Sequence, residues 1–397
     1  MNIKNTAIIG ALALLAGDAS AATRTFVITG ATAFRAAANN SIIQLLGGSG
    51  VTQYAFTGTQ GIAGTNRAIF KGTMAEFPGD EIIVKASWSG STQGIKDVAD
   101  QTAVQVLKSS VSMSTSGVNN AGASGDFETA LPRWSFSDVD KFLSERPNAT
   151  LGGGPVGVVP FMFVAGEGAP AGITNMTDQL HSTLWSTGSM PASMFTGNSS
   201  DSTAVLATGR NNGSGTRATI LAETGYGAFT NVVQYNASFT GNRTGAGDLT
   251  AISEFGNSGH SSNSGVRDLV TRNRNTLTFD GEGIDAVFVS YLTISDAVSA
   301  TGYQQATGSI SGGEGAIPMT YNGVRYSEAN VKNGAYSLWG YQQFYQAAGP
   351  TASETTFDTA FRAAIPNNMG TAGIPIPQMT VVRTGGDGGP IAPVAAE

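Results

Sequence analysis

Short apolar segments that alternate with helical patterns constrain this 397-residue chain more than any other feature of its sequence. Apolar strands are predicted at five places, namely residues 24–29, 81–88, 156–164, 204–208 and 284–291. The runs at 156–164 and 284–291 are almost continuously apolar, which is typical of strands buried on both faces of a sheet. Helical patterns follow three of the strands, at residues 32–46, 92–107 and 215–224, with Thr32 expected as the first N-cap. This repetition of strand, loop and helix indicates an α/β architecture with a mostly parallel sheet.

The first 21 residues have the three parts of a secretory signal peptide. Lys4 supplies a positive start, residues 6–16 form an apolar run, and Ala19-Ser20-Ala21 is a cleavage site. The apolar run is shorter than the roughly 20 residues that cross a bilayer, and no later stretch is longer and equally apolar. We therefore expect an exported protein that is not embedded in a membrane, periplasmic or else extracellular or on the cell surface, with a mature chain that begins near Ala22.

Charge and composition exclude several function classes. Only 12% of the residues are charged and the formal net charge is −7, so the basic footprint needed for nucleic acid is absent. The chain has no cysteine, hence no disulfide and no thiolate metal site. Its two histidines, His181 and His260, are too few for a multi-histidine zinc site. We expect neither a metal nor a cofactor.

Four loops rich in glycine, hydroxyl groups and small residues precede predicted helices. They are residues 29–34 (TGATAF), 89–94 (SGSTQG), 136–138 (FSD) and 210–216 (RNNGSGT). Free N–H groups at helix N-termini carry partial positive charge and bind anions, and Arg210 adds a planar fork that matches two oxygens of a phosphate. The last loop lacks the lysine of a P-loop, which disfavours nucleotide hydrolysis. The loops together predict a site for an oxyanion.

The order and residue patterns of these loops resemble those of the periplasmic phosphate-binding proteins of ABC uptake systems. The family's T-G-A/S-x-T-x-F, G-S-x-x-G-[IV]-K, x-S-D and R-x-x-G-S-G-T motifs correspond to residues 29–34, 90–96, 137–138 and 210–216. A further segment, residues 321–338, resembles the family's return to the second hinge strand. The resemblance implies a two-lobed periplasmic-binding-protein type 2 fold, in which each lobe is a mixed, mostly parallel sheet flanked by helices and two strands form a hinge.

Carried over residue by residue, the resemblance also implies a ligand set for inorganic phosphate. The implied ligands are Thr32, the backbone N–H of Ala33 or Phe34, Ser91, Asp138, Arg210, Ser214, Gly215 and Thr216. Lobe 1 would comprise residues 22–160 and 338–397, and lobe 2 residues 161–337, with crossovers near Val159 and Leu338. The protein would be a monomer without enzymatic activity that passes phosphate to a membrane ABC permease. The Gly-rich tail from Arg383 is expected to be disordered.

The chemistry of Asp138 favours phosphate independently of the family. An ionised carboxylate only accepts hydrogen bonds, so it repels an oxyanion that carries no proton. Phosphate at neutral pH keeps a proton that it can donate to Asp138, whereas sulfate has none. The other interpretation of Asp138 is a helix N-cap.

Two other functions remain open at this point. An extracellular or cell-surface structural protein could keep the fold without a transport role. The Ser/Gly/Asn-rich segments at residues 109–125 and 241–264, expected as flexible surface loops, suit it. An exported hydrolase could use Ser214 as its nucleophile, but only with His181 or His260 nearby. His181 lies in a helical pattern and is expected to be a surface or partly buried side chain.

Overall fold

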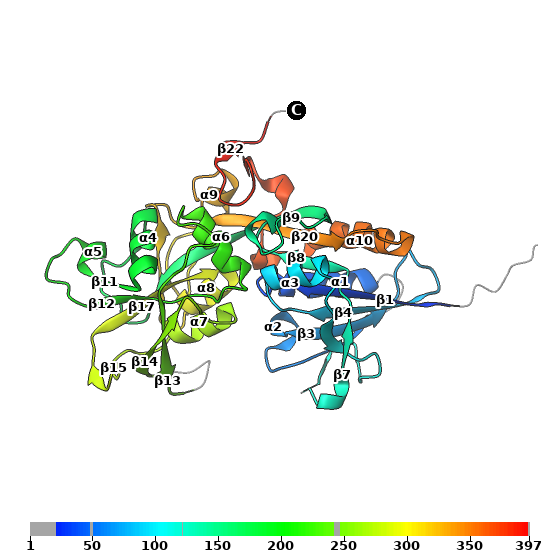
Figure 1. Ribbon diagram of the computed structural model, residues 1–397, viewed down its shortest axis with the longest axis horizontal. Helices are drawn as coiled ribbons and strands as arrows, with labels where there is room; N and C mark the ends of the chain where they lie inside the picture. Colours follow the sequence, from blue (N-terminus) through cyan, green and yellow to red (C-terminus); the bar gives the residue numbers. More distant parts are fainter. Residues whose placement is uncertain (1–20, 48–50, 121, 242–246, 396–397) are drawn as a thin grey trace, which may run out of the picture.

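A twelve-stranded mixed sheet runs through the molecule in the computed structural model, which describes residues 21–47, 51–120, 122–241 and 247–395. The strand order is β11-β12-β17-β9-β20-β8-β1-β4-β3-β2-β6, and β18 pairs with β9 beside this path. Helices gather around the two ends of the sheet, so that the molecule has two lobes (Figure 1). The chain is therefore a two-lobed α/β protein. The predicted signal peptide at residues 1–21 lies outside the described residues except for its last one.

The first lobe is built on a parallel core extended by antiparallel strands. β1 pairs in parallel with β4 and with β8, whereas β3 pairs antiparallel with β4 and with β2. Its strands are β1 (Thr23–Gly30), β2 (Gln53–Phe56), β3 (Arg67–Gly72), β4 (Glu81–Ser87), β6 (Val118–Asn119) and β8 (Trp134–Ser137), with β5 (Val104–Leu107) and β7 (Phe127–Ala130) as a separate pair. Because β1, β4 and β8 are parallel, the loops after them leave the sheet at one edge.

The second lobe has a smaller parallel core, in which β12 pairs with β17. All eight residues of β17 are buried, as its continuous apolar pattern predicts. Its strands are β11 (Ser189–Pro191), β12 (Ala204–Ala207), β17 (Ala286–Thr293) and β18 (Ile317–Pro318), with β10 (Asn175–Met176) and β19 (Thr320–Tyr321) as a pair and β13 (Gln234–Phe239), β14 (Leu249–Gly256), β15 (Thr278–Phe279) and β16 (Glu282–Gly283) as a four-stranded sheet.

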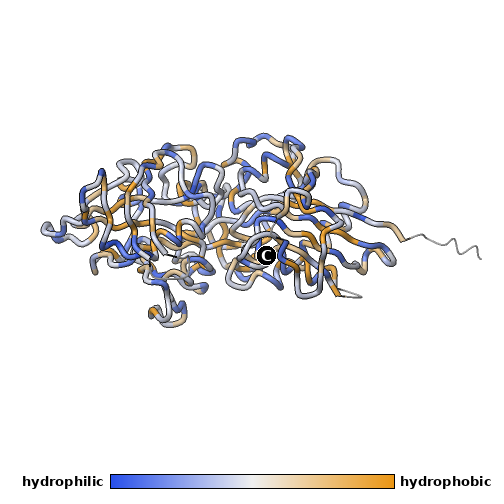
Figure 2. The backbone as a smooth tube through the Cα atoms, turned by 90° about the horizontal axis from the view of Figure 1, so that it is seen from below, coloured by the Kyte–Doolittle hydropathy of each residue, from blue (hydrophilic) through white to orange (hydrophobic). Residues whose placement is uncertain are grey.

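Two long antiparallel strands connect the lobes. They are β9 (Leu151–Ala165) and β20 (Trp339–Ala347). β9 pairs with β20 over its first two thirds and with β17 over its last residues, so one strand belongs to both lobes. Figure 1 shows both strands in the middle of the molecule, and Figure 2 shows the same elongated outline from below, with hydrophobic and hydrophilic stretches alternating along the backbone.

The helices flank the sheet on both lobes. The first lobe carries α1 (Arg35–Leu46), α2 (Gly61–Gly64), α3 (Ser91–Ala99) and α10 (Ala352–Ala364), and the second carries α4 (Asp178–Thr187), α5 (Ser193–Thr196), α6 (Gly215–Glu223), α7 (Asn263–Val270), α8 (Ile294–Thr301) and α9 (Glu328–Lys332). Short 3₁₀ turns lie at Ser124–Asp126, Lys141–Leu143, Ile365–Asn368, Gly370–Ala372 and Ile376–Gln378.

Three helix predictions need correction. α1 begins at Arg35 with Phe34 as its N-cap, so Thr32 is not the cap. The helix expected to reach residue 107 ends at Ala99, because the alternating Val104–Leu107 segment pairs with β7 instead. Asp138 precedes only a 3₁₀ turn, which is capped by the side chain of Asp140.

The C-terminal tail is ordered, contrary to the prediction from its glycine content. β21 (Val381–Arg383) and β22 (Ile391–Pro393) form an antiparallel hairpin, and Arg383 is 8% exposed. The second Ser/Gly/Asn-rich segment is also more regular than expected, since it contains strand β14. In both cases pairing with a neighbouring strand outweighs a composition that favours loops.

Helix α3 packs on strand β1 through a glycine, which yields a test of the fold. A Cβ at Gly94 would lie 2.5 Å from the Cα of Gly30 and from Ser135 Oγ, so the helix would have to shift. We expect Gly94→Ala to lower the free energy of unfolding by about 1–2 kcal/mol, measured by urea denaturation, although alanine alone favours a helix. Gly125→Ala is the matched control because a Cβ there meets nothing within 4 Å. Equal stabilities of the two variants would contradict the packing.

Candidate functional site

Asp138 is the centre of a buried hydrogen-bond network in the cleft between the lobes. It follows β8 and is 2% exposed. Its carboxylate accepts hydrogen bonds from two hydroxyl groups, Ser91 Oγ at Oδ1 and Thr216 Oγ1 at Oδ2, the second over 2.8 Å. The Thr219 hydroxyl donates to the Asp138 carbonyl over 2.6 Å. Three of the four predicted loops, at residues 89–94, 136–138 and 210–216, thus meet at one carboxylate.

Three helix N-termini border this network. Neither Phe34 before α1 nor Gly90 before α3 forms a side-chain cap, whereas Ser214 caps α6 by accepting the amide of Arg217. The loops before α3 and α6 touch, since a Cβ at Gly90 would lie 2.9 Å from the carbonyl oxygen of Gly213. The first amides of a helix have no acceptor within the helix and carry partial positive charge. The region around Asp138 therefore offers donors to an anion.

Arg210 supplies a buried positive charge beside this network. Its guanidinium is held by Asn263 Oδ1 at 3.0 Å and by the carbonyls of Ser261 at 2.9 Å and His260 at 3.2 Å. Burial lowers the pKa of Arg210 from its ordinary value, and the negative charge of Asp138 opposes this effect. The two side chains are thus close enough to interact electrostatically, and Arg210 is fixed in orientation by the second lobe.

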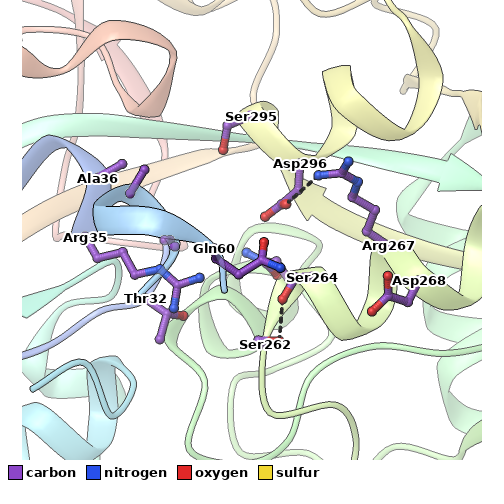
Figure 3. Close-up of a pocket in the computed structure, with 14 residues that line it drawn as sticks. Thr32, Arg35, Ala36, Gln60, Ser262, Ser264, Arg267, Asp268, Ser295 and Asp296 are labelled. Atoms are coloured by element: carbon purple, nitrogen blue, oxygen red, sulfur yellow. Dashed lines mark hydrogen bonds and ion pairs between the residues drawn. The ribbon is translucent and has the colours of Figure 1, made fainter. Parts of the chain in front are cut away.

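The cleft widens on one side of the network into a polar cavity of about 290 Å³ (Figure 3). The first lobe contributes Thr32, Ala33, Arg35 and Gln60 to it, and the second contributes Ser262, Asn263, Arg267 and Asp296, among others. Nη1 of Arg267 lies 3.7 Å from Oδ1 of Asp296. Residues of both lobes also line a second cavity of about 240 Å³, which includes Thr92, Asn212 and Arg217. Asn263 connects the larger cavity to Arg210.

The nine predicted site residues fall into three groups. Ser91, Asp138, Gly215 and Thr216 lie in direct contact. Arg210 and Ser214 flank them, Arg210 bound to residues 260–263 and Ser214 capping α6. Thr32 and Ala33 line the larger cavity, and the Phe34 side chain is fully buried against Phe136 with ring centroids 5.5 Å apart. At position 34 only the backbone could face a ligand.

Sequence reasoning missed two residues that shape the site. Arg217 is 6% exposed and donates to the backbone carbonyl of Asn257 at 2.7 Å, which fixes the α6 loop against the segment after β14. Asn263 orients Arg210 from the first turn of α7. A second arginine directly after the R-x-x-G-S-G-T motif could have drawn attention to Arg217, but nothing in the local sequence marks Asn263.

The histidines do not form a catalytic pair with Ser214. His181 is fully buried rather than exposed or partly buried, and its ring stacks on Trp185 with centroids 4.5 Å apart. His260 lies within 3.3 Å of the Thr208 hydroxyl, and burial together with Arg210 lowers its pKa to about 4. The Ser214 hydroxyl instead accepts an amide of its own helix. This arrangement does not support the hydrolase hypothesis.

No cluster of three or more histidine or acidic side chains suitable for a metal ion is found among the described residues. Within the same residues, no helix has the length and apolar character that crossing a bilayer requires.

No protein-family model and no curated protein matches this chain. Similar solved structures include a substrate-binding protein assigned to a phosphate ABC transporter of Clostridium perfringens, with bound phosphate, at 12% identity, a TM-score of 0.48, and 89% and 99% of the two chains covered. An ABC-type phosphate transport receptor from Vibrio cholerae is also 12% identical, with a TM-score of 0.47 and 89% and 100% covered. A periplasmic phosphate-binding protein with bound phosphate has 12% identity, a TM-score of 0.41, and 89% and 91% covered.

The burial of His181 predicts how stability depends on pH. Burial lowers its pKa from 6.5 to about 3, and neither ring nitrogen has a hydrogen-bond partner among the described residues. Below pH 6.5 His181 therefore binds a proton in the unfolded chain but stays neutral in the folded chain. The free energy of unfolding consequently falls as the pH drops from 6.5 toward 3. At pH 5 this loss amounts to about 2 kcal/mol.

We expect His181→Phe to remove that part of the pH dependence while keeping an aromatic ring on Trp185. Urea denaturation at pH 7 and pH 5 should show a smaller drop in the free energy of unfolding for the variant, by about 2 kcal/mol. Measurements at pH 8 serve as the control, because histidine is neutral there in both states. Parallel pH profiles for the two proteins would show that His181 is protonated when folded.

Proposed function

We propose that this chain is an exported solute-binding protein that captures inorganic phosphate in the cleft between its lobes and delivers it to a membrane ABC transporter. The observation that carries the proposal is the buried carboxylate of Asp138, which accepts hydrogen bonds from the hydroxyl groups of Ser91 and Thr216 beside the uncapped N-terminus of α3. Arg210 lies beside it with a fixed guanidinium. An acceptor among several donors suits an anion that itself carries a proton.

Phosphate binding at this site is an exchange of hydrogen bonds. The proton-bearing oxygen of phosphate donates to Asp138 in place of one hydroxyl, and that hydroxyl, from Ser91 or Thr216, becomes free to donate to another phosphate oxygen. Amides at the starts of α1, α3 and α6 and the charge of Arg210 stabilise the remaining oxygens. Sulfate has no proton at neutral pH and would leave two negative groups facing each other.

The two lobes supply different parts of this site. Ser91 and Asp138 come from the first lobe, and Arg210 and Thr216 from the second, so a ligand is enclosed only when both lobes surround it. We place the lobe boundaries near Val159 and Leu338, within and just before the long strands β9 and β20, which can bend as a hinge. The protein acts as a periplasmic monomer, and no bond is made or broken. The convergence of the loops supports binding over a purely structural role.

Discrimination between phosphate and sulfate is the direct test. By isothermal titration calorimetry we expect the wild-type protein to bind phosphate and to show little or no heat with sulfate. Asp138→Asn replaces an acceptor with an amide that also donates, so the preference for phosphate should fall about 100-fold, which corresponds to about 3 kcal/mol for an unpaired buried charge.

Asp280→Asn is the matched control for this substitution, because it removes the same charge from an exposed turn. Arg210→Ala should weaken both anions alike, since the guanidinium attracts any oxyanion. Equal affinities of the wild-type protein for phosphate and sulfate would overturn the proposed specificity, and an absence of heat with phosphate would overturn the function.

The glycine at the start of α6 gives a second test. A Cβ at Gly215 would lie 2.0 Å from Asp138 Oδ1 and 2.4 Å from Ser91 Oγ, so Gly215→Ala should push the two loops apart. We expect phosphate affinity to fall at least tenfold, since an overpacked contact of this kind is destabilised by about 1–3 kcal/mol. Gly213→Ala, two residues earlier, is the control, because the nearest atom to a Cβ there is 4.0 Å away. Similar affinities for both variants would place the anion elsewhere.

A further inference from the structure

The C-terminal hairpin lies over the strands that join the lobes, at the top centre of Figure 1. We call residues 381–393, which comprise β21, β22 and the turn between them, the C-terminal clasp. It is anchored at its base by Thr380, whose amide donates to the carbonyl of Lys332 over 2.9 Å. The clasp contacts both lobes through Arg383, Asp387 and Gly388.

Asp387 ties the clasp to the first lobe. The residue is 9% exposed. Its two carboxylate oxygens accept hydrogen bonds from two backbone N–H groups, that of Asp140 over 2.7 Å and that of Tyr341 over 3.0 Å. Asp140 stands two residues after Asp138, and Tyr341 lies on β20. One clasp carboxylate therefore holds both the loop that carries the central aspartate and a strand that joins the lobes.

Glu223 ties the clasp to the second lobe. It is the last residue of α6, and its side chain, 1% exposed, forms an ion pair with Arg383 over 2.6 Å. The other carboxylate oxygen accepts the amide of Gly388 over 2.8 Å. Arg383 also donates to the carbonyl of Trp339 over 3.0 Å and lies over its ring. Because α6 begins at Gly215, its far end is fixed to the clasp while its near end forms the site.

The same segment thus supports both partners of the hydrogen bond between Asp138 and Thr216. Asp138 is held through its neighbour Asp140, and Thr216 through the rigid helix that ends at Glu223. A displacement of either anchor would change the distance between the loops that hold the ligand. We infer that Asp387 and Glu223 are positioning residues for the oxyanion site, through which the C-terminal clasp sets phosphate affinity. The inference rests on the proposed function.

Both clasp carboxylates change charge near neutral pH. Burial raises the pKa of Glu223 to about 8 and that of Asp387 to about 7, and Arg383 opposes both shifts. Glu223 and Asp387 face one another, and the other titratable or charged groups around them are Asp140, Tyr321, Tyr341, Tyr345 and Arg383. Ionised Asp387 accepts two amides, but below about pH 7 it gains a proton, and one oxygen can then turn from acceptor to donor. The clasp is therefore tightest on the alkaline side of neutrality.

Asp387→Asn tests the role of the clasp, because asparagine resembles the protonated form at every pH. We expect its dissociation constant for phosphate to exceed that of the wild-type protein about tenfold at pH 8 and about twofold or less at pH 6, measured by calorimetry with inorganic phosphate. The ratio of the two constants cancels the ionisation of phosphate itself. Asp280→Asn should give a ratio near one at both pH values, since it is exposed and remote.

Glu223→Gln is the second variant, in case Asp387→Asn does not fold, and hydrogen exchange is a readout that needs no ligand. In either variant the amides of residues 138–141 and 215–219 should exchange faster than in the wild-type protein. Wild-type affinity in both variants at both pH values, with unchanged exchange, would overturn the inference while the proposed function stands. A wild-type protein that binds no phosphate would overturn the function, and the exchange measurement would then decide on the clasp alone.

Discussion

The hydrogen bond from Thr216 to Asp138 joins segments 78 residues apart, and the arrangement of the cleft depends on it. A buried carboxylate is stable only when donors satisfy it, and here the donors come from the starts of α3 and α6. They reach Asp138 because β1, β4 and β8 are parallel and end at one edge, while β12 leads into the α6 loop from the other lobe. The strand order of the sheet therefore determines which hydroxyl groups reach Asp138 in the cleft.

Sequence patterns could predict the elements that consist of consecutive apolar residues, because such runs are buried. Strand β17 and the second half of β9 are apolar throughout, and the loop motifs mark where strands end near α1, α3 and α6. The clasp could not be predicted, because its order depends on contacts with residues far away in the sequence. Arg383 pairs with Glu223, 160 residues earlier, and Asp387 accepts the amide N–H of Asp140, 247 residues earlier. His181 was misplaced for a related reason: a polar residue in an amphipathic helix is expected outside, but Trp185 and Phe163 enclose its ring.

A net charge of −7 does not oppose an anion site, because the relevant charges act locally. Exposed charges more than about 8–10 Å apart are screened at physiological ionic strength, whereas groups in a buried cleft are screened much less. Arg210 lies close enough to Asp138 for their charges to interact, and helix amides add partial positive charge without any net charge. A protein poor in charged residues can thus offer a local site of positive potential without a basic surface.

Affinity and specificity in such a cleft come from different groups. In the proposed site, Arg210 would provide affinity, because its guanidinium is already held by the carbonyls of residues 260 and 261 and by Asn263 and would need no reorganisation when an anion arrives. Asp138 would provide specificity in the proposed site, because its carboxylate accepts from a protonated anion and repels one without a proton, while its hydroxyl partners are able to turn from the carboxylate to the ligand. Selectivity therefore requires that Asp138 stay at a fixed distance from Arg210. That distance is set by the loop after β8 and by α6, the two elements whose outer ends are held by the clasp.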